Sequence, residues 1–113
     1  MTEHDIPAES IGRVDLLLGR ATALTAVRWD AVAPLIHEAM GIALVMAATY
    51  PSDVPVSVAG LDGLGELECV ARALREVQSW ELGLAADLLD LARLRVVLSD
   101  ARRALLADPA RRG

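Results

Sequence analysis

Apolar residues recur at alternating spacings of three and four along nearly the whole chain, and no other feature of the sequence limits the possible fold as strongly. This spacing places side chains on one face of an α-helix. In the first half the series is Ile11, Val14, Leu18, Ala21, Val32, Leu35, Ala39, Ile42 and Met46, and in the second half it is Leu67, Val70, Leu74, Val77, Leu84, Leu88, Leu91, Leu98 and Leu105. The pattern predicts an all-α fold.

A single cluster of helix-breaking residues divides the chain. Residues 50–61 read YPSDVPVSVAGL, with two prolines and a glycine, which are the strongest local breakers of regular structure. Pro7 suits the first turn of a helix. We therefore predict one helical domain, residues 1–113, with helical halves at about 7–49 and 62–107 and a turn at about 50–61.

Two weak points within these halves leave two architectures open. Pro34 lacks an N–H and crowds the preceding turn, so a kink or a new helix start is expected at residues 29–33. Ser79 could cap a new helix at Trp80, but neither point carries the glycine of a tight reversal between helices. The favoured fold is an antiparallel hairpin of two long, kinked helices, and the alternative is a single-chain four-helix bundle.

The charged residues favour the hairpin. Because helices rise equally per residue, facing residues of a hairpin centred on residues 50–61 have numbers that sum to about 110. This rule places acidic residues opposite arginines in the pairs Glu9 and Arg102, Asp15 and Arg95, Arg20 and Asp90, Arg28 and Glu81, and Glu38 and Arg72. Exposed ion pairs are each worth at most about 1 kcal/mol, so they support this register without deciding it.

The second helical half is too apolar for one partner helix to cover. A further apolar seam lies beside the first and consists of Ala85, Leu89, Ala92, Val96 and Leu106. A second copy of the chain is the simplest cover, so the hairpin is predicted to form a homodimer with a four-helix cross-section.

The net charge of the chain argues against nucleic acid as a partner. The formal net charge is -5, whereas binding to nucleic acid depends on neutralising phosphates with cationic side chains. We therefore expect no nucleic-acid partner. All 11 basic residues are arginine, which indicates the codon bias of a bacterial genome rich in G and C.

The expected compartment is the cytoplasm. The chain has one cysteine, Cys69, and its first twenty residues lack the charged start, apolar stretch and cleavage site of a signal peptide. The apolar run at residues 40–50 is shorter than the ~20 residues that a membrane-spanning helix needs. We expect no membrane association.

Few residues suggest a catalytic or metal-binding role. His4 and His37 are the only histidines, and His37 with Glu38 lacks the Glu-x-x-His spacing of bundle metal sites. Asp87 and Asp90 form a D-x-x-D pair that is more typical of a solvated, ion-paired face than of a Mg²⁺ site. Cys69 fits a packed thiol, and no Gly-rich phosphate loop or nucleophile motif is present. No metal or cofactor is predicted, and no catalytic residue is assigned.

The candidate binding surface is centred on the two tryptophans. In the hairpin register Trp29 and Trp80 are level, next to a polar interruption formed by Arg28, Asp30 and Glu81. Tryptophan and arginine are enriched at binding hot spots, although two tryptophans could equally fill the space where Pro34 disturbs packing.

Two classes of function fit these features. The preferred one is a non-catalytic helical module for protein–protein interaction, such as a regulator, adaptor or accessory subunit, because it needs only apolar helix faces. The alternative is a small-molecule-binding bundle, either an enzyme or an accessory protein of a biosynthetic pathway, with a cavity between its helices. The expected partner is a second copy of the chain, and another protein is an additional possibility.

Overall fold

The computed structural model describes residues 6, 8–25, 30–49, 56–57, 59–80 and 85–107. They form four helices: α1 (Ala8–Thr25), α2 (Ala33–Thr49), α3 (Glu66–Gln78) and α4 (Ala85–Ala107). No strand occurs in these ranges, so the predicted all-α class is confirmed.

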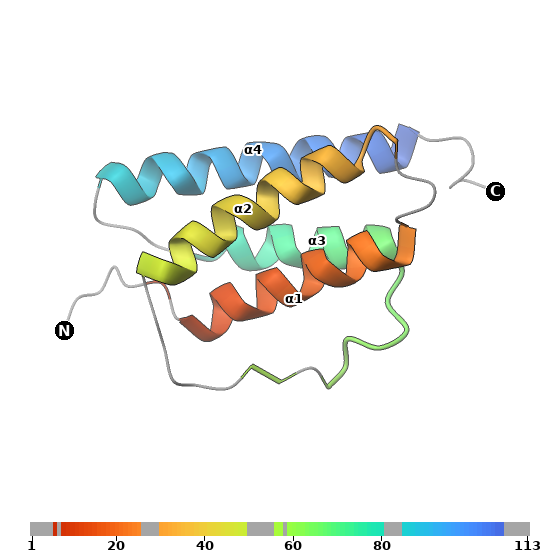
Figure 1. Cartoon of the computed structure of the whole chain (residues 1–113), viewed down its shortest axis with the longest axis horizontal. Coiled ribbons are helices and arrows are strands. Elements are labelled where there is room, and N and C mark those ends of the chain that lie inside the picture. Colours follow the sequence, from red (N-terminus) through yellow and green to blue (C-terminus); the bar gives the residue numbers. More distant parts are fainter. Residues whose placement is uncertain are drawn as a thin grey trace.

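The helices contact one another in a closed ring. α1 packs against α2 and α3, and α4 packs against the same two helices. Among the described residues there is no close approach between α1 and α4 or between α2 and α3, which therefore occupy diagonal corners. Figure 1 shows that helices in contact run antiparallel and that diagonal helices run parallel. This arrangement is compatible with the alternative prediction of a single-chain bundle.

The favoured hairpin of two long helices is not what the structure shows, because both weak points separate distinct helices. Pro34 lies in the first turn of α2, where its missing N–H costs no helical hydrogen bond. At the other point, the Ser79 N–H donates to the carbonyls of Arg75 and Glu76 at 3.2 and 3.1 Å, and the Ser79 hydroxyl donates to Glu76 O at 2.6 Å. These bonds satisfy the last carbonyls of α3 and end it.

The predicted register fails with the hairpin. The pairs 9 with 102, 15 with 95 and 20 with 90 would join α1 to α4, and 38 with 72 would join α2 to α3, yet the described backbones of these helices do not come close to each other. Among the described residues, Arg13 instead pairs with Glu76 at 3.3 Å, Arg20 with Asp62 at 3.5 Å, and Arg93 with Glu38 at 3.6 Å. The fifth predicted pair, Arg28 with Glu81, lies outside the described residues.

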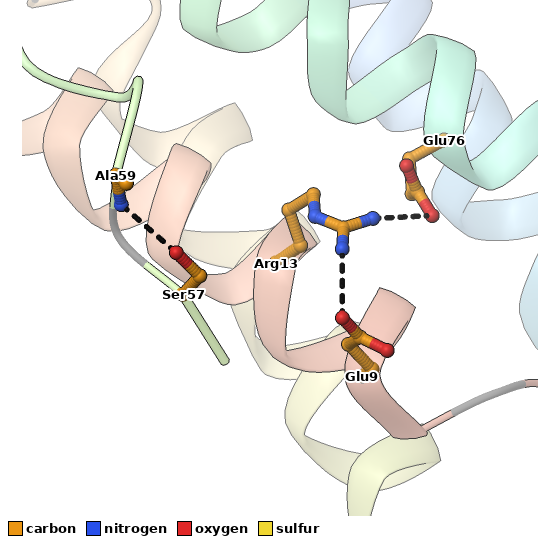
Figure 2. Close-up of polar contacts among 5 residues, drawn as sticks. All are labelled: Glu9, Arg13, Ser57, Ala59 and Glu76. Atoms are coloured by element: carbon orange, nitrogen blue, oxygen red, sulfur yellow. Dashed lines mark hydrogen bonds and ion pairs between the residues drawn. The ribbon is translucent and has the colours of Figure 1, made fainter. Parts of the chain in front are cut away.

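The link between α2 and α3 crosses the length of the bundle instead of reversing the chain locally. α2 ends and α3 begins at opposite ends of the molecule in Figure 1. The described part of this crossover, residues 56–57 and 59–65, lies beside α1, where Val56 approaches Gly12 so closely that a Cβ on the glycine would overlap Cγ2 of the valine. Figure 2 shows the Ala59 N–H bonded to the Ser57 hydroxyl, at 3.2 Å, in this segment.

Glycines shape the end of the crossover. Gly60 and Gly63 have φ angles of 85° and 83°, in the left-handed region that favours glycine. Leu61 between them is buried in the core, so the crossover adds a side chain to the bundle interior.

The core is built from aliphatic side chains of all four helices. Its largest fully buried members are Ile11, Leu17, Leu18, Ile36, Met46, Leu94, Leu98 and Leu105. Trp80, at the end of α3, is also buried.

Candidate functional site

The predicted tryptophan surface is described only in part. Arg28, Trp29 and Glu81 lie outside the described residues. Trp80 is only 5% exposed and packs in the core, whereas Asp30 is exposed in the turn before α2. α2 begins at one end of the bundle and α3 ends toward the other (Figure 1), so the structure does not bring Asp30 and Trp80 together. The predicted proximity of Trp29 and Trp80 lies outside the described residues.

Arg95 forms hydrogen bonds to the backbone around Trp80. Its guanidinium Nη2 donates from α4 to the carbonyl oxygens of Val77, Gln78 and Trp80 at 3.2, 3.1 and 3.5 Å. A cation at these carbonyls offsets the partial negative charge at the C-terminus of α3. The Trp80 indole Nε1 is buried without a hydrogen-bond partner among the described residues. The described surroundings of Trp80 therefore resemble a helix end more than a binding surface.

The residues considered for metal chemistry do not gather. His37 is exposed, and Glu38 pairs with Arg93. Asp90 is half-buried on α4, and the side chain of Asp87 lies outside the described residues. Within the described ranges, no three His, Cys, Asp or Glu residues are grouped so that they could hold a metal ion.

Cys69 is a packed thiol, as its apolar pattern predicted. It is fully buried on α3, and burial raises the pKa of its thiol. The nearby guanidinium of Arg20 offsets part of this increase in pKa by favouring the thiolate. The net direction is upward, so the group is a poor nucleophile at neutral pH.

One face of the bundle exposes large apolar side chains. We call it the α2–α4 face, formed by Gly41 and Val45 of α2 and by Leu89, Ala92 and Val96 of α4. Val45, Leu89 and Val96 are 58%, 69% and 59% exposed. Shallow depressions of about 260 and 320 Å³ lie along this face, and the pair Glu38–Arg93 borders both. The exposed residues of α4 belong to the second apolar seam that the sequence indicated.

The opposite side carries a groove with arginines. This α1–α3 groove has a volume of about 380 Å³ and is lined by Arg13, Leu17, Leu61, Arg72, Arg75, Glu76 and Ser79. Figure 2 shows Arg13 extending from α1 with one terminal nitrogen toward Glu76 and the other toward Glu9, each at 3.3 Å. The sequence alone does not indicate this groove, because only the pairing of α1 with α3 brings its residues together. The spacing of Arg72 and Arg75 on one helix face was the available signal.

The comparisons with known proteins give no relative to which this chain can be compared. No protein-family model matches the sequence, and no curated protein or solved structure matches it. Among the described residues, none of the helices has the length and apolar character needed to cross a membrane.

Proposed function

We propose that this protein is a non-catalytic helical interaction module, a regulator, adaptor or accessory subunit, that works as a homodimer through its α2–α4 face. One observation carries the proposal: α4 exposes the large apolar side chains of Leu88, Leu89, Val96 and Leu106 although its inward side already supplies the core. Contiguous exposed apolar surface is typical of an interaction site.

A second copy of the chain fits this face because the face is complementary to itself. A two-fold dimer brings the same patch of both subunits together, so any charge in the patch must find its opposite within the same patch. Glu38 and Arg93 supply both signs at the border between α2 and α4. In a two-fold contact Glu38 of one copy can approach Arg93 of the other while Val45, Leu89 and Val96 pack together.

Light scattering on a sizing column tests the dimer. We expect the wild-type protein to have twice its chain mass at micromolar concentration, and Leu89→Glu with Val96→Glu to reduce it to a monomer. Because both side chains are exposed in the isolated chain, the helical circular dichroism of this double variant should be unchanged.

Leu24→Glu is the matched control, since Leu24 is about half exposed on α1, outside the α2–α4 face. It should leave the dimer intact. A monomeric wild type, or a dimer that survives the Leu89 and Val96 substitutions, would reject the proposal.

A further inference from the structure

The outward side of α4 alternates large and small residues. Leu89 and Val96 are 69% and 59% exposed, Ala92 between them is exposed, and Ser99 is half-buried. The two large residues are seven positions apart and so are the two small ones, and all four follow the spacing of three and four that lines one face of a helix. We call these four residues the α4 stripe. A seven-residue repeat of this kind is the pattern by which one helix packs lengthwise on another.

The α4 stripe fits a second α4 when the two helices run antiparallel. In a level parallel pair, Val96 would meet Val96 and Ala92 would meet Ala92, which leaves unfilled space beside the alanines. In an antiparallel pair whose facing residues have numbers that sum to about 188, Val96 is level with Ala92 of the second copy, because both helices rise equally per residue. Leu89 is then level with Ser99 of the second copy. Each large side chain therefore packs on a small one.

The length of the contact favours this register. It overlaps residues 85–103 of both copies, which is most of α4. The other size-matched register, in which Leu89 is level with Ala92 of the second copy, has numbers that sum to about 181 and overlaps only residues 85–96. Because the apolar area removed from water grows with the overlap, the longer contact is the more stable one.

Charges of both signs meet where the two copies cross. In this register the two-fold axis passes level with residue 94, one position from Arg93, and it leaves α2 of both copies on the same side of the interface. Arg93 pairs there with Glu38 of α2 at 3.6 Å. Two arginines and two glutamates therefore surround the axis, so each Arg93 keeps a carboxylate partner. The depression of about 320 Å³ beside Ala92 lies at the same level and gives Val96 of the second copy room to enter.

We propose, on the basis of the homodimer proposed above, that α4 packs antiparallel on α4 of the second copy, with Val96 on Ala92 and Leu89 on Ser99. The occupant of the apolar face is thus a helix with the same alternation of large and small residues, running in the opposite direction. The size match and the paired charges favour a second copy over an unrelated apolar helix.

Disulfide cross-linking between different cysteine variants tests the register. Ala92→Cys mixed with Val96→Cys, and Leu89→Cys mixed with Ser99→Cys, should form covalent dimers under mild oxidation, as measured on non-reducing gels. They should do so about ten-fold faster than each variant alone or than Leu89→Cys mixed with Ala92→Cys, because a disulfide needs Cα atoms about 4.4 to 6.8 Å apart. Wild-type protein is the control, since its only cysteine, Cys69, is fully buried.

Overpacking gives a second test that needs no cysteine. Ala92→Leu adds apolar area at an exposed position, but it occupies the space of Val96 from the second copy, so it should raise the dimer dissociation constant about ten-fold in analytical ultracentrifugation. Adding Val96→Ala should recover most of this loss. Ala23→Leu is the control, because Ala23 is exposed on α1 and its replacement should leave the dimer unchanged.

The outcomes separate this packing from the homodimer itself. A wild type that is monomeric by light scattering would reject both. With a dimeric wild type, four results would overturn the antiparallel α4 pairing and leave the homodimer standing: fastest cross-linking by Ala92→Cys alone, fastest cross-linking by Leu89→Cys mixed with Ala92→Cys, no cross-linking by any mixture, or an Ala92→Leu dimer that is as tight as the wild type or tighter.

Discussion

Gly12 leaves room for Val56, the residue through which the crossover lies against α1. Replacing a glycine inside a helix with alanine normally adds about 1 kcal/mol of stability. At Gly12 the new methyl group would overlap Val56, and overpacking of this kind costs about 1 to 3 kcal/mol. We expect Gly12→Ala to lower the free energy of unfolding, as measured by urea denaturation.

Gly19 provides the matched control in the same helix. A Cβ there meets no atom within 4 Å, so Gly19→Ala should gain the ordinary helical contribution of about 1 kcal/mol. Adding Val56→Ala to Gly12→Ala should restore most of the lost stability. If Gly12→Ala and Gly19→Ala were equally stabilising, the close approach of the crossover to α1 would be refuted.

Asp15 makes stability depend on pH in an unusual direction for a carboxylate. Burial raises the pKa of its half-buried side chain above the ordinary value. The folded state therefore binds the proton more tightly than the unfolded state does, and ionisation of Asp15 opposes folding. This unfavourable contribution is fully present above the folded pKa and disappears as the pH falls below the unfolded pKa.

Asp15→Asn should accordingly raise the midpoint of thermal unfolding at pH 7, and the gain should shrink as the pH is lowered through the folded pKa toward the ordinary value. Unfolding curves followed by circular dichroism at a series of pH values measure this difference. A gain that stayed constant with pH would show that burial of the charge is not its cause.

The residue-level roles differ in how far sequence could predict them. The burial of Cys69 followed from its place in an apolar helical pattern. Gly12 and Arg95 act on residues at least 15 positions away in the chain, and no local pattern indicates such partners. Gly12 is crowded only because the crossover passes beside α1, and the residues around Gly12 do not show which helix the crossover passes.

At the level of elements, Arg95 is the residue that joins α4 to the end of α3. It donates to three carbonyls there, and the Ser79 hydroxyl satisfies a fourth acceptor. Arg95→Met keeps much of the apolar stem but removes these bonds and the charge, so it should lower the free energy of unfolding by about 1 to 3 kcal/mol.

Arg102→Met is the comparison, because Arg102 is exposed on the same helix and its loss should change stability by no more than about 0.5 kcal/mol. Hydrogen exchange adds a local measurement: the amides of the last turn of α3 should lose protection in Arg95→Met first. Equal effects of the two substitutions would contradict the capping role.

The helix boundaries show what local chemistry can and cannot predict. Pro34 and Ser79 were identified as weak points, and helices do begin and end beside them. The sequence favours the hairpin because neither point carries a glycine and because the hairpin register pairs opposite charges. The structure ends α3 with hydrogen bonds from Ser79 and Arg95 instead, and a side chain from another helix cannot be foreseen from the residues next to the break.

At the level of the whole molecule, the helical class could be predicted but the pairing of helices could not. In the described part of the chain, the opposite-charge pairs of the hairpin register join exposed or half-buried residues, and ion pairs near the surface contribute too little to select a fold. Arg20 and Glu38 form ion pairs with other residues, Asp62 and Arg93, instead of the predicted ones. The α1–α3 groove and the α2–α4 face are both products of this pairing, which is why sequence indicated apolar excess on one helix but no arginine groove.

The crossover also sets the order in which the chain can assemble. Helices α1 and α2 are neighbours in sequence, as are α3 and α4, so each pair can form from local contacts. Contacts across the two halves, such as that between Arg13 and Glu76, join residues 63 positions apart and must wait for a large loop to close. We therefore expect the two helical pairs to form first and then dock, so that the groove between α1 and α3 is completed only at the docking step.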